Sequence, residues 1–217
     1  MLLNLFSFDN KYYNNMGFGS LTGIDEAGRG PLAGPVAAAA VIFPKDLILP
    51  DLNDSKKLSE KKREALFEMI KEKASAYAIE TVDNKIIDKI NILKATFLAM
   101  SRAVLKLKIK PDLCLIDGNQ KIPGLPFNQE TIVKGDAKSA CIAAASILAK
   151  VARDRIMFRY AKKYPVYEFE KHKGYGTKKH IEILKKYGHC PIHRITFSAV
   201  SNITAESNLN LRIHNEN

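Results

Sequence analysis

The fold is decided by residues 21–43, LTGIDEAGRGPLAGPVAAAAVIF. Residues 21–26 and 35–43 suit β-strands, and the segment between them holds glycines and prolines that interrupt regular structure. The second run, PVAAAAVIF, is apolar at successive positions, so both of its faces must be buried. We therefore expect a central strand that needs cover on two sides, as in a sheet between layers of helices.

Hydrophobic periodicity divides the rest of the chain into helices and strands. Apolar residues at helical spacing predict helices over residues 59–74, 90–107, 138–163 and 177–188. Short apolar or alternating runs predict further strands over residues 77–82, 112–119 and 128–136. Residues 1–20 have no clear period and predict an irregular or short-stranded lead-in, and the tail over 201–217 is polar and rich in asparagine. This order of elements predicts an α/β fold with a mixed sheet covered by helices.

Size and charge limit the classes of function. A chain of 217 residues is long enough for one domain with a substantial core, so we expect a single globular unit. Lysine and arginine outnumber aspartate and glutamate by 34 to 23, which gives a net charge of +11 and attracts polyanions. Nucleic acid is the first partner to consider, and lysines that only solvate helices are the alternative.

Cysteine usage and hydropathy point to a reducing, aqueous compartment. Cys114, Cys141 and Cys190 are odd in number and widely spaced, which favours neither a disulfide framework nor a zinc site. No run approaches the roughly 20 apolar residues that span a bilayer, and the first residues lack the pattern of a signal peptide. We expect a cytoplasmic protein that binds no membrane.

Acidic residues stand where apolar runs stop: Asp25 with its neighbour Glu26, then Asp117, then Asp136. Ligands of open α/β sheets bind beyond the carboxyl ends of strands, where these side chains would meet. Clustered carboxylates repel one another unless a cation neutralises them. Their oxygens suit Mg²⁺ or Mn²⁺, and two such ions can stabilise the attacking and leaving oxygens of phosphoryl transfer. Because neighbours on a regular strand face opposite sides, joint binding by Asp25 and Glu26 requires that the strand end or bulge there.

Each acid also has an ordinary structural interpretation. Asp25 and Glu26 could form a polar turn or an acid/base dyad, Asp117 with Gly118 is a common turn dipeptide, and Asp136 could cap the following helix. Their joint occurrence at the ends of three buried runs favours the metal interpretation.

One other catalytic pattern is weaker. Ser59 and Lys62 satisfy the S-x-x-K pattern of serine hydrolases, but no S-D-N or K-T-G accompanies them and Ser59 is placed as a helix cap. The stretch GFGSLTG lacks the spacing and the preceding strand of a dinucleotide-binding loop.

Several motifs together resemble the ribonuclease HII family, the type 2 ribonucleases H. They run in the family's order from about Leu21 to Ser198: GIDEAGRGPLAGPVAAAAVI, NDSKKLS, LIDGN, KGDAKSACIAAASILAKVARD, HKGYGT and PIHRITF. The resemblance implies a ribonuclease H-like mixed five-stranded sheet flanked by helices, with a C-terminal helical extension. It places the catalytic domain over residues 21–200, after the lead-in of residues 1–20 and before the tail of residues 201–217.

The resemblance also implies an activity and a metal centre. It implies an endonuclease that cuts the RNA strand of RNA/DNA hybrids or incises 5′ to ribonucleotides in duplex DNA, leaving 5′-phosphate and 3′-hydroxyl ends. Asp25, Glu26, Asp117 and Asp136 would be the catalytic, metal-binding acids. They would hold Mg²⁺ or Mn²⁺, with two ions when substrate is bound, in a protein that acts as a monomer.

Substrate contacts follow from the same motifs. The resemblance assigns Gly28, Arg29 and Gly30 to sensing the ribose 2′-hydroxyl, and Tyr175 to stacking on the neighbouring deoxyribose. Glycines there would let backbone groups approach a sugar closely. Without the resemblance, Tyr175 would be interpreted as a half-buried loop residue. Lys56 stands before a helix start, where phosphate contact and ordinary solvation are both open.

Some matched positions carry no assigned role. His193 and Arg194 of PIHRITF fit the family pattern, and a structural turn is the default interpretation. Ala140 and Cys141 stand where other small or apolar residues are expected, and they affect no catalytic position. The competing functions are a non-catalytic nucleic-acid binder and a different nuclease or strand-transfer enzyme on the same fold. A strand-transfer enzyme would act on all-DNA ends.

Overall fold

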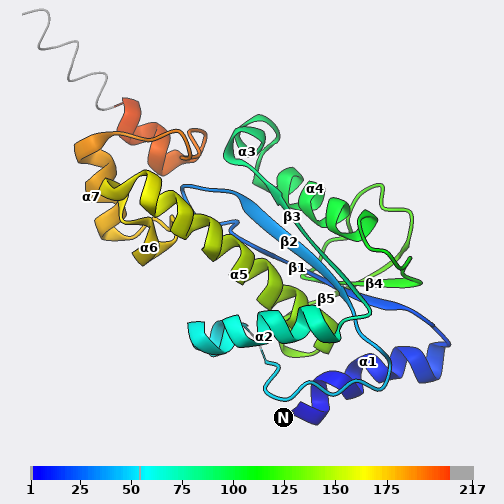
Figure 1. Cartoon of the computed structure of the whole chain (residues 1–217). Coiled ribbons are helices and arrows are strands. Elements are labelled where there is room, and N and C mark those ends of the chain that lie inside the picture. The colour runs from blue at the N-terminus through cyan, green and yellow to red at the C-terminus, as the bar shows by residue number, and fades with distance from the viewer. Residues whose placement is uncertain (1, 54, 206–217) are drawn as a thin grey trace, which may run out of the picture. The chain divides into compact units, whose positions relative to one another are not determined.

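The computed structural model describes residues 2–53 and 55–205 and contains one five-stranded sheet (Figure 1). The strands are β1 (Leu21–Ala27), β2 (Val36–Ile42), β3 (Ala76–Val82), β4 (Leu113–Asp117) and β5 (Asn128–Ile132), in the order β3-β2-β1-β4-β5. β1 runs antiparallel to β2 and parallel to β4, and β4 runs parallel to β5. The predicted mixed five-stranded sheet is therefore confirmed.

The helices agree with the predicted ones in most places. The α-helices are α1 (Leu2–Met16), α2 (Glu60–Lys73), α3 (Asn84–Ile90), α4 (Ile92–Leu105), α5 (Ala140–Lys163), α6 (Phe169–His172) and α7 (Lys178–Tyr187). Short 3-10 turns are η1 (Ser55–Lys57), η2 (Gly135–Ala137) and η3 (Pro165–Tyr167). The helix predicted over residues 90–107 begins two residues later, because Asn91 has a φ of 67° and its side chain caps α4 by accepting from the Lys94 amide. The preceding α3 was not predicted, although Asp83 caps it at the Ile86 amide.

The first half of α5 packs closely on β1 and β2 because the residues between them are small. All seven residues of β2 are buried, as the apolar run predicted. The start of α5 comes so near β1 that a Cβ on Gly23 would lie 2.1 Å from the Cys141 carbonyl carbon. Figure 1 shows α2 and the first half of α5 on one face of the sheet and most of α4 on the other.

The expected irregular lead-in is wrong, because Leu2–Met16 form α1. Asparagine and aromatic residues are modest helix formers, so local propensity gave no signal. Tertiary contacts supply the stability: Phe6 packs against Phe43, and Tyr12 donates to Glu130 at 2.7 Å. The Asp9 carboxylate accepts from the Cys141 amide at 2.9 Å and so satisfies the start of α5. Burial nevertheless raises the Asp9 pKa to about 6.

The chain forms two compact units rather than the single unit expected from its length. Unit 1 comprises the described parts of Met1–Ala27, Ala37–Thr81 and Thr96–Ala152, and unit 2 those of Gly28–Val36, Val82–Ala95 and Arg153–Asn217. Residues 198–205 are helical, which corrects the start of the expected polar tail, and residues 206–217 lie outside the described part. Within residues 2–53 and 55–205, no helix has the length and apolar character needed to cross a bilayer.

Candidate active site

The four predicted acids lie in unit 1, at one edge of the sheet. Asp25 and Glu26 lie near the end of β1, Asp117 is the last residue of β4, and Asp136 lies in η2 just after β5. Because these three neighbouring strands are parallel, their carboxyl ends share one edge. We call these four residues the acidic cluster.

Asp117 and Asp136 make contacts beyond a simple turn and a helix cap. The Asp117 carboxylate accepts from the Gly135 amide at 2.7 Å, which ties the end of β4 to η2. The Ser139 hydroxyl accepts from the Ile142 amide in the first turn of α5. Ser139, and not Asp136, therefore caps this helix.

β1 stays regular through the acidic pair. Asp25 and Glu26 pair in sequence with Ala39 and Ala38, and Ala27 continues the register, so the strand neither ends nor bulges at the acids as joint binding would require. Across residues 2–53 and 55–205, no three histidine, cysteine, aspartate or glutamate side chains stand as close together as a metal ligand set. The acidic cluster is thus brought to one edge without being closed into a ligand shell.

Electrostatic repulsion links the acidic cluster. Asp25 is 5% exposed, and its burial raises its pKa well above the usual value, with further increases from the charges of Glu26 and Asp117. The pKa of Asp117 is also raised by burial, with an increase from the charge of Asp136 and a decrease from the Gly135 hydrogen bond. Oxygen ligands that repel one another in a partly dry site fit a hard divalent cation.

Lys56 lies on the acidic cluster rather than apart from it. Its ammonium is 2.9 Å from the Asp136 carboxylate, and its side chain is 77% exposed whereas that of Asp136 is 6% exposed. The charge of Lys56 also lowers the pKa of Asp117. The sequence offered phosphate contact or solvation for this lysine, and the pairing with a predicted metal ligand was missed.

Two serines beside the acids were also missed. Ser146 of α5 lowers the pKa of Asp25 through a side-chain hydrogen bond, and its hydroxyl lies 2.9 Å from that of Ser55 in η1. Both serines are buried. The motif NDSKKLS contains Ser55, but the sequence does not show that this serine contacts Ser146. Only the folded chain reveals that contact. Ser59, by contrast, is the N-cap of α2, as predicted, and accepts from the Lys62 amide at 3.3 Å.

The residues predicted to sense ribose lie in unit 2. Gly28 is buried with a φ of +97°, whereas Arg29 and Gly30 are exposed. A Cβ on Gly30 would lie 3.7 Å from a ring carbon of Tyr175, so this aromatic side chain, 44% exposed, packs beside the glycine. The Leu32 amide donates to the Gly174 carbonyl at 2.8 Å and joins the two segments.

His193 and Arg194 do more than form a turn. Both are buried, at 1% and 0% exposure, and an isolated bridge joins His193 to Ala33. The cysteines are all buried and free, which agrees with the expected absence of a disulfide framework.

Comparisons with known proteins place these features in context. The model of the Ribonuclease HII family matches residues 22–200. The ribonuclease HII of Endomicrobium trichonymphae is 72% identical over 211 residues, 97% of this chain and 100% of that protein. The crystal structure of ribonuclease H2 from Pyrococcus horikoshii OT3 is similar with a TM-score of 0.73 and 30% identity, covering 86% of this chain and 98% of that chain. The Bst-RNase HIII structure in complex with Mn²⁺ shares the fold, with a TM-score of 0.66, 18% identity and coverage of 86% and 69%.

Proposed function

The chain belongs to the ribonuclease HII family and is a metal-dependent endoribonuclease of ribonuclease H type 2, and from this premise we propose its substrates and products. It hydrolyses the RNA strand of RNA/DNA hybrids and incises 5′ to ribonucleotides embedded in duplex DNA. Water attacks the phosphorus and the bond to the 3′-oxygen of the preceding nucleotide breaks. That oxygen takes up a proton and leaves as a 3′-hydroxyl, and the phosphate stays on the 5′ end of the ribonucleotide.

The mutual repulsion of the acidic cluster is the observation that supports this proposal best. Asp25 is destabilised as an anion by burial, by Glu26 and by Asp117, and Asp117 is destabilised by burial and by Asp136. A protein that only bound nucleic acid would gain nothing from buried carboxylates, because they repel phosphate. Carboxylates that hold cations at a phosphodiester explain the same arrangement.

We assign the metal centre to all four acids, and because β1 is regular at Asp25 and Glu26, joint binding by this pair would require the strand to distort there when the cation binds. Asp25, Glu26, Asp117 and Asp136 would hold Mg²⁺ or Mn²⁺, with two ions when substrate is bound. Bound divalent cations supply charge that polarises water and stabilises the oxygens of the scissile phosphate. Lys56, mostly exposed beside Asp136, offers a positive charge to the phosphate backbone.

Ribose recognition is assigned to unit 2. The exposed backbone of Arg29 and Gly30, which begins three positions after Glu26 in the chain, would contact the 2′-hydroxyl that distinguishes RNA from DNA. Tyr175, packed beside Gly30, would stack on the deoxyribose after the ribonucleotide. Residues 21–200 would then be the catalytic domain of a cytoplasmic monomer, and the charge of +11 on the whole chain would attract the duplex.

A duplex that contains one ribonucleotide tests this proposal. Incubation with Mg²⁺ or Mn²⁺ should give a single incision 5′ to the ribonucleotide, and excess EDTA should abolish it. An all-DNA duplex of the same sequence is the control and should remain intact. Cleavage of the all-DNA control would favour a different nuclease or strand-transfer enzyme, and binding without incision would favour a non-catalytic binder.

A further inference from the structure

His193 and Arg194 place an imidazole and a guanidinium side by side in the interior of unit 2. A buried guanidinium is unfavourable unless its donors find partners, so the identity of those partners shows what the residue holds. The function proposed above does not use either residue.

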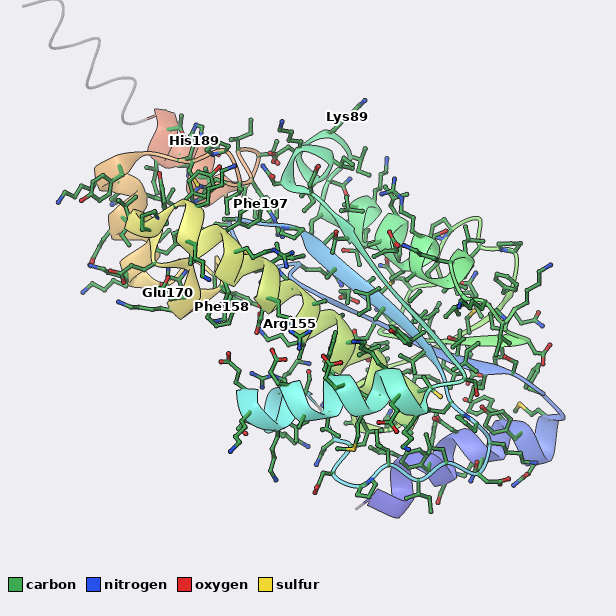
Figure 2. All side chains as sticks on the ribbon, in the orientation of Figure 1. Lys89, Arg155, Phe158, Glu170, His189 and Phe197 are labelled. Atoms are coloured by element: carbon green, nitrogen blue, oxygen red, sulfur yellow. The ribbon has the colours of Figure 1, made fainter. Side chains whose placement is uncertain are left out.

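Arg194 donates to three carbonyls of the ribose-sensing loop. Its Nη2 donates to the Gly28 carbonyl at 2.6 Å, its Nη1 to the Arg29 carbonyl at 2.9 Å, and its Nε to the Gly34 carbonyl at 3.0 Å. The ring of Phe197, labelled in Figure 2, lies 5.1 Å from the guanidinium carbon. Burial and, secondly, the charge of Arg153 lower the Arg194 pKa to about 9, which leaves it protonated at neutral pH.

These hydrogen bonds fix which way the loop amides face. In a planar trans peptide unit, the carbonyl of one residue and the N–H of the next point in opposite directions. Because the carbonyls of Gly28 and Arg29 point at Arg194, the N–H groups of Arg29 and Gly30 point away from it. Both of these residues are exposed, so Arg194 orients two backbone donors outward at the segment proposed to contact ribose.

Arg153 holds the returning part of the same loop. Its Nε donates to the Pro35 carbonyl at 3.0 Å and its Nη2 to the Ala33 carbonyl at 3.1 Å. It also sets the need for glycine at position 28, because a Cβ there would lie 2.1 Å from the Arg153 Nε. Fixed fork-shaped donors suit this task, whereas a lysine offers one compact charge.

His193 reaches Tyr175 through His180. The His180 Nδ1 lies 2.9 Å from the Tyr175 carbonyl, which only accepts, so Nδ1 must carry the proton. The neutral His180 ring then accepts at Nε2, where the His193 Nε2 donates at 3.0 Å. The His193 Nδ1 accepts in turn from the Cys190 amide at 2.9 Å. The shorter contacts thus assign one tautomer to each ring, and the chain of hydrogen bonds ends on the backbone of Tyr175.

We propose that the His193–Arg194 pair is the positioning element for ribose recognition. Arg194 turns the amides of the Gly28–Gly30 segment outward, and His193, through His180, holds the backbone at Tyr175. We call Arg153, His180, His193 and Arg194 the loop framework. This inference rests on the proposed function, because it concerns how the same loop distinguishes ribose from deoxyribose.

Arg194→Lys tests the first half by binding rather than by turnover. Two affinities are measured by fluorescence anisotropy in EDTA. One is for a duplex that contains a single ribonucleotide, and the other is for the all-DNA duplex of the same sequence. The wild type should prefer the ribonucleotide, and Arg194→Lys should lower that preference about tenfold, since hydrogen bonds to a charged group are lost. Affinity for all-DNA should stay within about twofold, because phosphate contacts are not altered. Arg159→Lys, an exposed arginine on α5, is the matched control and should behave as wild type.

His193→Gln and His193→Phe test the second half. Glutamine keeps a donor near the position of Nε2, whereas phenylalanine keeps the ring shape without the donor. The preference for the ribonucleotide should be retained by the glutamine variant and lost by the phenylalanine variant. This pair decides the question even if Arg194→Lys fails to fold, which circular dichroism would show.

Two outcomes overturn the inference in distinguishable ways. If the wild type prefers the ribonucleotide and folded Arg194→Lys or His193→Phe keeps the full preference, that residue has no positioning role while the proposed function stands. If the wild type itself binds both duplexes equally and makes no incision, the proposed function fails and takes the inference with it.

Discussion

The acidic cluster and the loop framework both bury titratable groups, but they satisfy them in opposite ways. In the acidic cluster, Asp25 faces like charges, and repulsion from Glu26 and Asp117 adds to the effect of burial. In the loop framework, each donor of Arg194 that faces the loop meets a carbonyl, and His193 donates to one neighbour and accepts from another. The first region is suited to exchanging partners, and the second to holding one geometry.

The two regions should therefore respond to pH with opposite signs. The folded-state pKa of Asp25 is raised, so its contribution to stability is greatest at low pH and is lost as pH rises through that pKa. Burial lowers the pKa of His180 to about 4 and that of His193 to about 3, below the usual value of 6.5. Their contribution is present above pH 6.5 and is lost as pH falls towards these folded-state values.

The largest expected effect separates activity from stability in the acidic cluster. Asp25→Asn should lower incision of the ribonucleotide duplex at least about a thousandfold, equivalent to roughly 4 kcal/mol, since a metal ligand is lost. The same change should raise the thermal midpoint at neutral pH, because it removes a buried anion from among like charges. Asp46→Asn, at an exposed site, is the control and should alter neither quantity. Unchanged turnover in Asp25→Asn would contradict the metal role.

The loop framework should instead lose stability when its packing is changed. Gly28→Ala places a Cβ 2.1 Å from Arg153 at a φ of +97°. We expect a loss of roughly 2–5 kcal/mol in the free energy of unfolding from overpacking and backbone strain together. Mn²⁺ affinity, measured by calorimetry on the folded fraction, should be unchanged. Gly30→Ala, whose Cβ would meet only a ring carbon at 3.7 Å, is the matched control, and equal losses in both variants would refute the packing argument.

The sequence could predict that the four acids lie at one edge of the sheet, because the signals for this are local. Asp25 and Asp117 directly follow apolar runs, Asp136 comes shortly after a third run, and the runs define adjacent strands of the sheet. The sequence could not predict that β1 stays regular through Asp25 and Glu26, because this depends on pairing with β2 that continues through Ala27. The pairing of Lys56 with Asp136 was likewise hidden, since 80 residues separate the two.

The loop framework escaped prediction for a physical reason. Arg194 bonds carbonyls that lie 160–166 residues earlier, and a carbonyl is present at every position, so no side-chain pattern marks its partners. The helix α1 escaped for a similar reason, because long-range contacts such as that of Asp9 with Cys141 stabilise a segment of modest propensity. Hydrophobic periodicity and the positions of glycine and proline thus predicted the sheet. The loop framework and α1 depend on long-range contacts to backbone groups, which these patterns do not show.

Acid should weaken the loop framework through its histidines. Between pH 7.5 and pH 5, His180 and His193 should each lower the free energy of unfolding by roughly 2 kcal/mol. The reason is that each histidine binds a proton in the unfolded chain but not in the folded chain. Denaturant unfolding across this range measures the slope. His193→Gln should flatten the slope. His189→Gln, at the exposed histidine labelled in Figure 2, should change it less, because the charge of His189 only adds to the lowering of the His193 pKa. Equal slopes in the wild type and His193→Gln would assign the acid sensitivity to other groups.

The smallest effect concerns Lys56, which forms an ion pair with the predicted ligand Asp136. Lys56→Met removes the ammonium 2.9 Å from Asp136, and because this lysine is mostly exposed, the pair contributes little. Mn²⁺ affinity should therefore rise only about twofold to fivefold in calorimetric titration, which corresponds to a surface ion pair of up to about 1 kcal/mol. Lys57→Met, at the exposed neighbouring lysine, controls for the general loss of positive charge.

The direction of this small effect decides whether the acidic cluster exchanges partners. A rise confined to Lys56→Met means that the lysine and the cation compete for the same carboxylate, so that Asp136 releases one partner to take the other. An unchanged or lower Mn²⁺ affinity would mean that Asp136 keeps its lysine, as Arg194 keeps its carbonyls. The acidic cluster would then hold its partners as firmly as the loop framework does, and the proposed contrast between the two regions would fail at Asp136.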